Sequence, residues 1–328
     1  MPDLQGFHHI TAITGDAPTN LDFYCRVMGM RMVKKTVNFD APEVYHLYYA
    51  DETGTPGSVL TFFEFPGAQR GQAGSGMVHR IGWTVAGEAS LNFWGNRLLG
   101  EGIRAERRGH ALRFHDREGL GLELVAADTG DPLLRAEVED IPAEHALLGF
   151  AGVHAFSAQP EATEKVLTDL LGFKADGSRF RHRSPGRQAT YDIDPPPSTS
   201  PIQGAGSVHH VAWASSDDDH EDWHTTLVGA GVQPTPIIDR TYFRSIYFRE
   251  PSGVLFEIAT LGPGFEVDEP MESLGEALVL PERYEVMRPW LEKNLTPITN
   301  PRSHNPEPAG DLAPEAELDP APEGETVG

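Results

Sequence analysis

The chain has 328 residues, more than a single hydrophobic core usually holds, so two domains or duplicated halves are expected. Its 49 Asp and Glu against 26 Lys and Arg give a net charge of −23, which disfavours nucleic acid and anionic membranes as partners. Cys25 is the one cysteine, so there is no disulfide framework. No signal-peptide pattern or membrane-spanning apolar run is present, and we expect a cytoplasmic protein.

Four short apolar stretches have similar sequences and predict four equivalent buried strands. They are FHHITAIT from residue 7, MVHRIGWTV from 77, GVHAFSAQ from 152 and VHHVAWAS from 208. Each is rich in β-branched and aromatic residues and too short for a helix. Two of them carry a histidine pair, and histidine is costly in a buried strand unless its ring nitrogens have partners. The two pairs therefore need a common explanation.

A helical pattern follows each of these strands, with apolar residues at three- and four-residue spacing and a glycine near its end. The predicted helices cover 20–30, 90–103, 162–173 and 221–232. Paired strands come next. The predicted hairpins join 45–51 with 58–65, 111–116 with 120–126, and 245–250 with 254–260, and the third repeat has a weaker counterpart at 180–194.

A βαβββ unit repeated four times resembles the vicinal oxygen chelate superfamily, in which paired units curl into a cup around a metal. The resemblance covers about residues 6–262 and implies an α+β fold, with four βαβββ modules paired into two cup-shaped mixed sheets, the glyoxalase/bleomycin resistance/dioxygenase fold. We expect one two-module domain at 6–130 and a second at 150–262, whose first module is weak. Residues 263–299 predict a partly helical C-terminal arm, and the acidic, proline-rich stretch 300–328 predicts a disordered tail.

Glu257 stands in the middle of an otherwise apolar predicted strand, where a carboxylate without a cation is costly. In such a cup the first and last strands of a module lie side by side, so His210 and Glu257 can converge on one ion. His9, at the matching place of the first module, would complete two histidines and one carboxylate. This facial set leaves coordination positions open and suits Fe(II) or Mn(II) chemistry with oxygen.

Two other interpretations of these residues stay open. The histidines could be core residues bonded to backbone carbonyls, with Glu257 paired to an arginine such as Arg249. The metal, or a second metal, could instead lie in the other cup, where His79, Glu123 and His154 occupy comparable places. Those two histidines stand alone where the other modules have pairs, which favours the first cup.

Within this superfamily, the sequence resembles the ring-cleaving dioxygenases that act on hydroquinones, the para-diols. The matching stretches are HHIT, YHLYYADETGTPGSVLT, VHHVAWA, DRTYFRSIYFREPSGVLFE and LGPGF. In that family the second histidine of each pair and the glutamate of the last strand bind iron, which implies His9, His210 and Glu257. The resemblance also implies residues that surround the metal, namely His8, Thr11, His209, Arg240 and Tyr247.

The first histidine of each pair should face away from the second, because side chains alternate between the two faces of a strand. Strict alternation along a strand puts His8 and His209 on the faces opposite His9 and His210. They can point into the cup only where a strand starts or bulges, and otherwise would form hydrogen bonds across the seam between strands. Arg240 lies in a predicted loop and could equally be a surface arginine.

The resemblance implies an Fe(II)-dependent dioxygenase of aromatic compound catabolism, with Mn(II) as the other metal, that inserts O2 next to a hydroxylated ring carbon. Its partners would be a small aromatic substrate and O2, and a homo-oligomer stays open. Three alternatives remain: a catechol extradiol dioxygenase, a glyoxalase-like metal isomerase and a metal-free module that binds an aromatic compound. The isomerase would need a fourth protein ligand, for which Glu64 is the candidate, although we expect Glu64 to face solvent.

Overall fold

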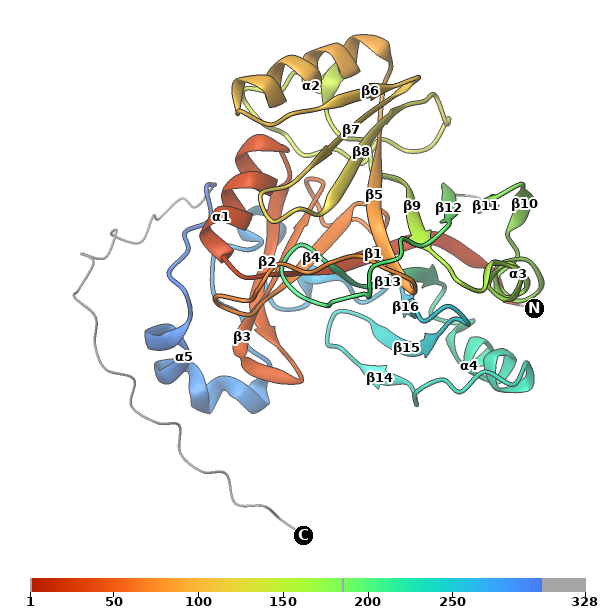
Figure 1. Ribbon diagram of the computed structural model, residues 1–328. Coiled ribbons are helices and arrows are strands. Elements are labelled where there is room, and N and C mark those ends of the chain that lie inside the picture. Colours follow the sequence, from red (N-terminus) through yellow and green to blue (C-terminus); the bar gives the residue numbers. More distant parts are fainter. Residues whose placement is uncertain (1, 185, 303–328) are drawn as a thin grey trace.

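The computed structural model describes residues 2–184 and 186–302, and its secondary structure repeats the order strand, helix, three strands four times (Figure 1). The predicted disordered tail at 300–328 lies almost wholly outside the described residues. No helix in the described part of the chain is long and apolar enough to cross a lipid bilayer.

The four modules contain the predicted elements, including the weak third module. Module 1 consists of β1 (Leu4–Thr14), α1 (Ala17–Leu21), the π-helical turn η1 (Asp22–Val27), β2 (Arg31–Asn38), β3 (Ala41–Ala50) and β4 (Val59–Glu64). Module 2 consists of β5 (Met77–Val85), α2 (Glu88–Gly100), β6 (Glu106–Arg108), β7 (Ala111–His115) and β8 (Gly121–Ala126), and is followed by η2 (Ala143–His145). Module 3 consists of β9 (Phe150–Phe156), α3 (Pro160–Lys165), η3 (Val166–Leu170), β10 (Lys174–Asp176), β11 (Arg179–Arg183) and β12 (Gln188–Asp194). Module 4 consists of β13 (Val208–Ser215), α4 (His220–Gly229), β14 (Ile238–Asp239), β15 (Arg244–Arg249) and β16 (Leu255–Thr260).

The modules pair into two eight-stranded mixed sheets, which confirms the expected fold class. The strand orders are β14-β15-β16-β13-β1-β4-β3-β2 and β10-β11-β12-β9-β5-β8-β7-β6. At the centre of each sheet the first strands of two modules run antiparallel, and each is flanked in parallel by the last strand of its own module. One sheet therefore joins module 1 to module 4, and the other joins module 2 to module 3. The stretches 6–130 and 150–262 each contribute one module to each sheet.

A shared hydrophobic core lies between the two sheets. Phe7 of β1 stacks on Trp213 of β13 at 4.7 Å between ring centroids and meets Phe150 of β9 edge-on at 5.8 Å. The helices pack against the same core, and each long one buries a tryptophan in it, Trp94 in α2 and Trp223 in α4. Because apolar side chains fill this interface, the polar side chains of β1 and β13 are directed to the other face of their sheet, inside the cup.

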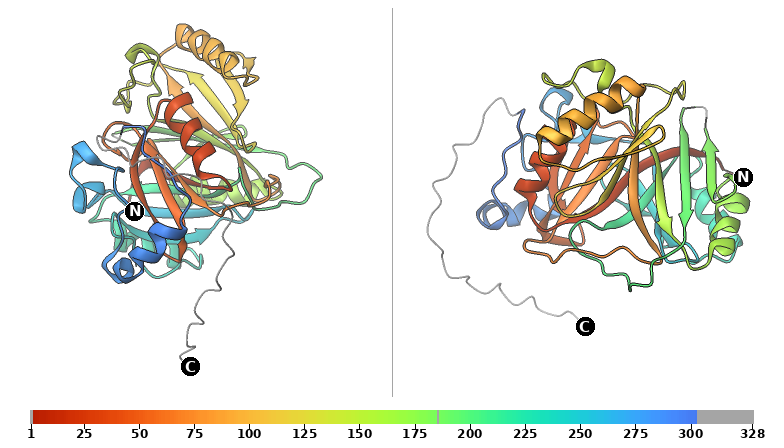
Figure 2. Two further views of the ribbon diagram at one scale, coloured as in Figure 1. Left: turned by 90° about the vertical axis from the view of Figure 1, so that its left-hand side faces the viewer. Right: turned by 45° about the horizontal axis from the view of Figure 1, so that its top comes forward.

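The C-terminal arm covers β2, the edge strand of the first sheet, and is helical in part, as predicted. It contains η4 (Phe265–Val267), η5 (Met271–Ser273), η6 (Glu282–Met287) and α5 (Arg288–Asn294). Figure 2 shows the arm in blue beside the red and orange strands of module 1. The ammonium of Lys34, fully buried, lies 2.5 Å from carboxylate oxygens of both Asp268 and Glu269. The arm thus covers a sheet edge that would otherwise be exposed, and the ion cluster of Lys34, Asp268 and Glu269 holds the arm there.

Candidate metal centre

The three predicted ligands meet at one point of the first sheet. Nε2 of His9 lies 3.1 Å from Nε2 of His210, and Oε2 of Glu257 lies 3.3 Å and 3.0 Å from these two nitrogens. All three side chains are buried. Donor atoms that share one ion at about 2.1 Å lie about 3.0–3.4 Å apart, the range between octahedral and tetrahedral arrangements. His9, His210 and Glu257 therefore fit a single metal ion.

The carboxylate of Glu257 carries a buried charge that a cation would neutralise. Its Oε1 accepts a hydrogen bond from Ser245 Oγ at 2.5 Å, whereas its Oε2 makes no hydrogen bond of good geometry. Burial by itself raises the pKa of this carboxyl, but His9 and His210 outweigh burial and hold the pKa well below its ordinary value. The alternative partner, Arg249, donates instead to the carbonyl of Gly253. The donor set, in which Oε2 faces only the two histidine nitrogens, suits a metal site rather than a satisfied core.

A β-bulge lies at each histidine pair. In the ladder between β1 and β13, the register shifts at His8 and again at His209. A bulge adds one residue to a strand and re-aims the side chains around it. Consequently both rings of a pair lie on the same side of the sheet, which strict alternation would not allow.

The first histidine of each pair contacts the second ring nitrogen of the ligand beside it. Nδ1 of His8 lies 2.9 Å from Nδ1 of His9, and Nδ1 of His209 lies 2.8 Å from Nδ1 of His210. Such partners fix the orientation and tautomer of a metal-binding histidine. Burial, and then the neighbouring His9, lower the pKa of His8 to about 3. His8 is buried, whereas His209 is exposed to the cavity described next.

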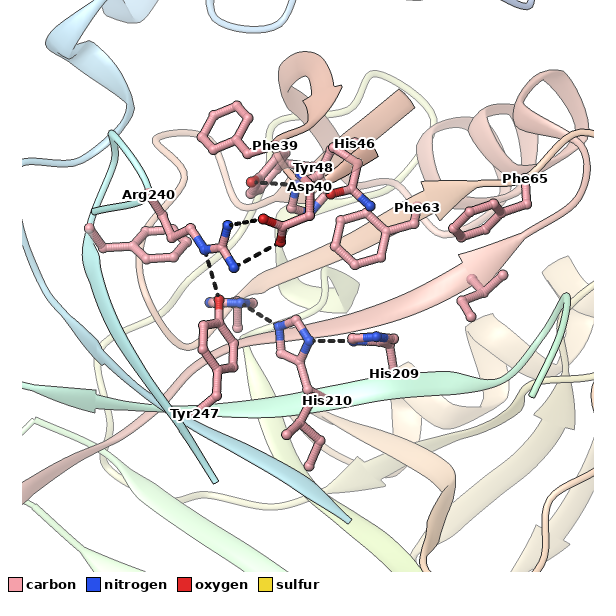
Figure 3. Close-up of a pocket in the computed structure, with 15 residues that line it drawn as sticks. Phe39, Asp40, His46, Tyr48, Phe63, Phe65, His209, His210, Arg240 and Tyr247 are labelled. Atoms are coloured by element: carbon pink, nitrogen blue, oxygen red, sulfur yellow. Dashed lines mark hydrogen bonds and ion pairs between the residues drawn. The ribbon is translucent and has the colours of Figure 1, made fainter. Parts of the chain in front are cut away.

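A cavity of about 480 Å³ opens beside the cluster, between modules 1 and 4 (Figure 3). Its walls are mainly aromatic and aliphatic, with a few polar groups, as is usual for small-molecule sites. The lining residues are His9, Ile13, Asn38, Phe39, Asp40, His46, Tyr48, Phe63, Phe65, His209, His210, Arg240, Phe243, Tyr247 and Leu255. The cavity is large enough for one substituted aromatic ring.

Arg240 and Tyr247 form one wall of this cavity, so Arg240 is not simply a surface arginine. Nε of Arg240 donates to the hydroxyl of Tyr247 at 3.3 Å, and its two terminal nitrogens pair with Asp40 at 3.1 Å and 3.0 Å (Figure 3). Asp40 lies between β2 and β3, so the pair joins module 4 to module 1. Burial and the nearby Glu257 carboxylate raise the pKa of Tyr247 well above its ordinary value, and its hydroxyl keeps its hydrogen.

A chain of hydrogen bonds that the sequence analysis missed runs from Thr11 along the cavity wall. Thr11 Oγ1 lies 2.8 Å from Thr61 Oγ1, which lies 2.8 Å from His46 Nε2, and Nδ1 of His46 lies 2.8 Å from the hydroxyl of Tyr48. Burial, and then the nearby His9, lower the pKa of His46 well below its ordinary value. His46 could have been found by the argument applied to the two histidine pairs, because it too is a histidine in a predicted buried strand.

Thr61 stands in module 1 where Glu257 stands in module 4. Glu257 pairs with Ala212, two residues after the ligand His210, and Thr61 pairs with Thr11, two residues after the ligand His9. A fourth ligand from the first module would be expected at this place, and a threonine that bonds its neighbours does not supply a carboxylate. Among the described residues, the cluster offers three protein ligands.

Glu64 does not face solvent, and this expectation was wrong. Its side chain is 1% exposed and accepts hydrogen bonds from the backbone N–H of Ala17 at 3.0 Å and from Thr296 Oγ1 at 2.8 Å. The carboxylate therefore satisfies an amide at the start of α1. It is not a member of the metal cluster, which weakens the isomerase alternative.

The second cup lacks histidines at the places that carry the ligands in the first cup. In the first cup, His9 pairs with Ala212 and Thr11 pairs with His210 across the central ladder. The corresponding pairs of the second cup are Arg80 with His154 and Gly82 with Gly152. The ligand positions thus hold Arg80 and Gly152. His79 and His154 therefore do not occupy the ligand positions of the first cup. Glu123 does stand at the place comparable to Glu257, because it pairs with Gly82 as Thr61 pairs with Thr11.

The carboxylates of the second cup are already neutralised. Glu123 pairs with Arg113, and Asp192 Oδ1 lies 2.7 Å from Nε of Arg179. These arginines supply the positive charge that a metal would bring to the first cup. The cup of modules 1 and 4 is therefore the better candidate for a metal site.

Comparison with known proteins assigns the family. The sequence model of the Glyoxalase/Bleomycin resistance protein/Dioxygenase superfamily matches residues 6–131 and 142–258. The chain belongs to this superfamily, which confirms the resemblance inferred from its repeats.

Several relatives are named ring-cleaving dioxygenases. MhqO of Bacillus subtilis (strain 168) carries this name and is 40% identical over 303 residues, or 90% of this chain and 96% of its own. A protein of Sphingobium indicum named chlorohydroquinone/hydroquinone 1,2-dioxygenase is 33% identical over 300 residues, or 85% of this chain and 92% of its own. The enzyme class implied by the sequence agrees with these names.

Solved structures show the same fold. A crystal structure described as a Bacillus subtilis dioxygenase superposes with a TM-score of 0.84 at 38% identity, covering 90% of this chain and 98% of that one. Glyoxalase I from Zea mays, with a TM-score of 0.54 and 15% identity over 78% of this chain and 92% of its own, shares the fold alone.

Proposed function

We propose that this protein is an Fe(II)-dependent dioxygenase that cleaves the ring of a hydroquinone-type para-diol next to a hydroxylated carbon. The observation that carries the proposal is the cluster of His9, His210 and Glu257 at the side of an aromatic-lined cavity, with Thr61 where a fourth ligand would stand. A set of two histidines and one carboxylate suits non-haem Fe(II), and Mn(II) is the other metal to test. When bound, the metal would activate a phenol and O2 for ring cleavage.

The aromatic walls select and orient the ring. Phe39, Phe63 and Phe243 line the cavity and offer faces and edges to a flat substrate. They also displace water from the ring, so that the reacting carbon meets O2 in a dry site. The relative named chlorohydroquinone/hydroquinone 1,2-dioxygenase supports a ring of this kind.

Tyr247 and Arg240 would bind the second hydroxyl of a para-diol. In hydroquinone the two hydroxyls lie on opposite sides of the ring, so one can reach the metal while the other needs its own partner. Tyr247 keeps its hydrogen and is held by Arg240, which Asp40 anchors from module 1. A catechol, whose hydroxyls are adjacent, would leave this wall unused.

The histidines beside the ligands would act in different ways. Both hold the Nδ1 side of a ligand and keep its Nε2 directed to the metal. Only His209 also lines the cavity, so it can touch the substrate, whereas His8 acts through His9. Thr11, tied to Thr61, is placed beside the ligand His9.

The test is O2 uptake by the chain loaded with Fe(II) without oxygen, with hydroquinone, chlorinated and methylated hydroquinones, and catechol as substrates. We expect uptake and a ring-opened product with para-diols, lost in His9→Gln and kept in His182→Gln, a buried histidine of β11 on the other sheet. A preference for catechol would refute the para-diol assignment. Bound iron without uptake for any diol would refute the dioxygenase and favour a binding module or an isomerase.

A further inference from the structure

A second group of ligating side chains meets outside the cavity, on the other sheet. Nε2 of His79 lies 2.8 Å and Nδ1 of His154 lies 3.3 Å from the same oxygen, Oδ2 of Asp194. The three donor atoms lie within 4.8 Å of one another. We propose that His79, His154 and Asp194 form a second metal site, for a borderline divalent cation such as Zn²⁺.

Three adjacent strands hold this group, because β5, β9 and β12 are neighbours in the second sheet. The ladder between β5 and β9 shifts its register at His79, so a bulge re-aims this histidine as bulges do at the pairs of the first cup. The ring of His79 stacks on Phe156 at 3.9 Å between centroids, which fixes its plane. Asp194 is the last residue of β12, and its carboxylate reaches both rings from the strand end.

The surroundings of His154 match those of a metal-binding histidine. While Nδ1 faces Asp194, its Nε2 lies 3.6 Å from carboxylate oxygens of both Glu123 and Asp192. A carboxylate on the far nitrogen is the usual outer partner of such a ligand, because it sets the tautomer and raises basicity. Glu123 and Asp192 also pair with arginines, so they serve as outer partners of His154, and Asp194 is the carboxylate ligand.

The donor set and its exposure indicate the cation. Two imidazoles and one carboxylate favour borderline cations such as Zn²⁺, Co²⁺, Ni²⁺ or Fe²⁺ over Ca²⁺ or Mg²⁺, which prefer oxygen. The side chain of Asp194 is 37% exposed while the histidines are 10–11% exposed, so water could complete the coordination. A metal here would connect three central strands of the second sheet and stabilise the folded chain by mass action.

The experiment measures Zn²⁺ per chain after dialysis against Zn²⁺ and metal-free buffer, in full-length variants. We expect two ions in the wild type, one in His9→Gln/His210→Gln, which disables the first site, and one in Asp194→Asn. Affinity of the second site should fall at least about tenfold in His79→Gln or Asp194→Asn and stay unchanged in His182→Gln. Far-ultraviolet circular dichroism checks that each variant is folded.

A second measurement needs no change at the proposed site. Co²⁺ added to His9→Gln/His210→Gln should give visible ligand-field bands that Zn²⁺ removes, and Zn²⁺ should raise the melting temperature of the same variant. Absence of the bands and of the shift, together with one Zn²⁺ or fewer in the wild type, would overturn the second site. Activity is not the readout, so the outcome does not depend on the proposed dioxygenase reaction.

Discussion

At the scale of single residues, Glu257 decides what the centre can be. It is a fully buried, ionised carboxylate whose Oε2 faces two histidine nitrogens and no hydrogen-bond donor of good geometry. The sequence could predict it, because a charged residue inside an apolar strand is costly without a cation. Thr61 could not be predicted as its counterpart, since the equivalence depends on which strands pair.

Replacing Glu257 with Gln should remove the metal and leave the fold. The amide keeps the shape but loses the charge that holds a cation, so we expect at least about a tenfold loss of Fe(II) affinity and no O2 uptake. Glu64→Gln is the matched control, because Glu64 is equally buried at the end of β4 and bonds only Ala17 and Thr296 among its identified partners. Iron analysis of both variants checks the prediction, and full iron in Glu257→Gln would contradict the ligand assignment.

Replacing Thr61 with Val should lower stability and turnover while iron content stays constant. The change keeps the volume but leaves the Thr11 hydroxyl and one nitrogen of His46 without their partner, which costs about 1–3 kcal/mol. Urea unfolding measures the loss. Thr225→Val, at an exposed position of α4, should change stability by no more than about 0.5 kcal/mol. Equal effects of the two substitutions would mean that the buried chain contributes nothing.

At the scale of elements, bulges and loops build the site. Alternation and helical periodicity predicted the first strand, the helix and the closing hairpin of modules 1, 2 and 4, and a weaker hairpin in module 3. The second strand of each module, β2, β6, β10 or β14, was implied only by the resemblance. These patterns could not predict that the ladder of β1 and β13 bulges at both pairs, because a bulge depends on the partner strand. Nor could they find Asp40, a turn residue whose partner Arg240 is 200 residues away in the chain.

Replacing Arg240 with Ala should impair the reaction without removing the metal. Tyr247 would lose its partner on the cavity wall, so turnover of hydroquinone should fall at least about tenfold while iron per chain is unchanged. Arg249→Ala is the control on the same hairpin, because Arg249 donates to the carbonyl of Gly253. Loss of iron in Arg240→Ala would sink the assignment of this wall to the substrate.

The C-terminal arm stabilises the edge strand β2 through Lys34. Neutralising both acidic partners of Lys34, in Asp268→Asn/Glu269→Gln, would leave a buried ammonium without an anion. We expect a loss of about 3–5 kcal/mol in the free energy of unfolding, measured in urea. Glu272→Gln, an exposed carboxylate of the same arm, should have little effect. A small loss in the double variant would show that water reaches Lys34.

At the scale of the whole molecule, the centre is made where the two ends of a duplicated chain meet. β1 and β13 are paired although His9 and His210 are 201 residues apart, and the ligand set needs both. Equivalence of the four modules alone is compatible with any pairing. The histidine pairs and Glu257 predicted that module 1 joins module 4, and the strand order confirms it. The net charge of −23 disfavours nucleic acid as a partner, but it carries no information on the fold.

This pairing also orders the events of synthesis. Ribosomes add about 5–20 residues each second, so β1 waits about 10–40 seconds for the strand that will pair with it. Modules 2 and 3 are consecutive and can pair during that interval, whereas module 1 still lacks module 4, which forms the other half of its sheet. Nascent chains stalled before Val208 are therefore expected to retain no iron at His9, because the metal centre can form only after module 4 has been made.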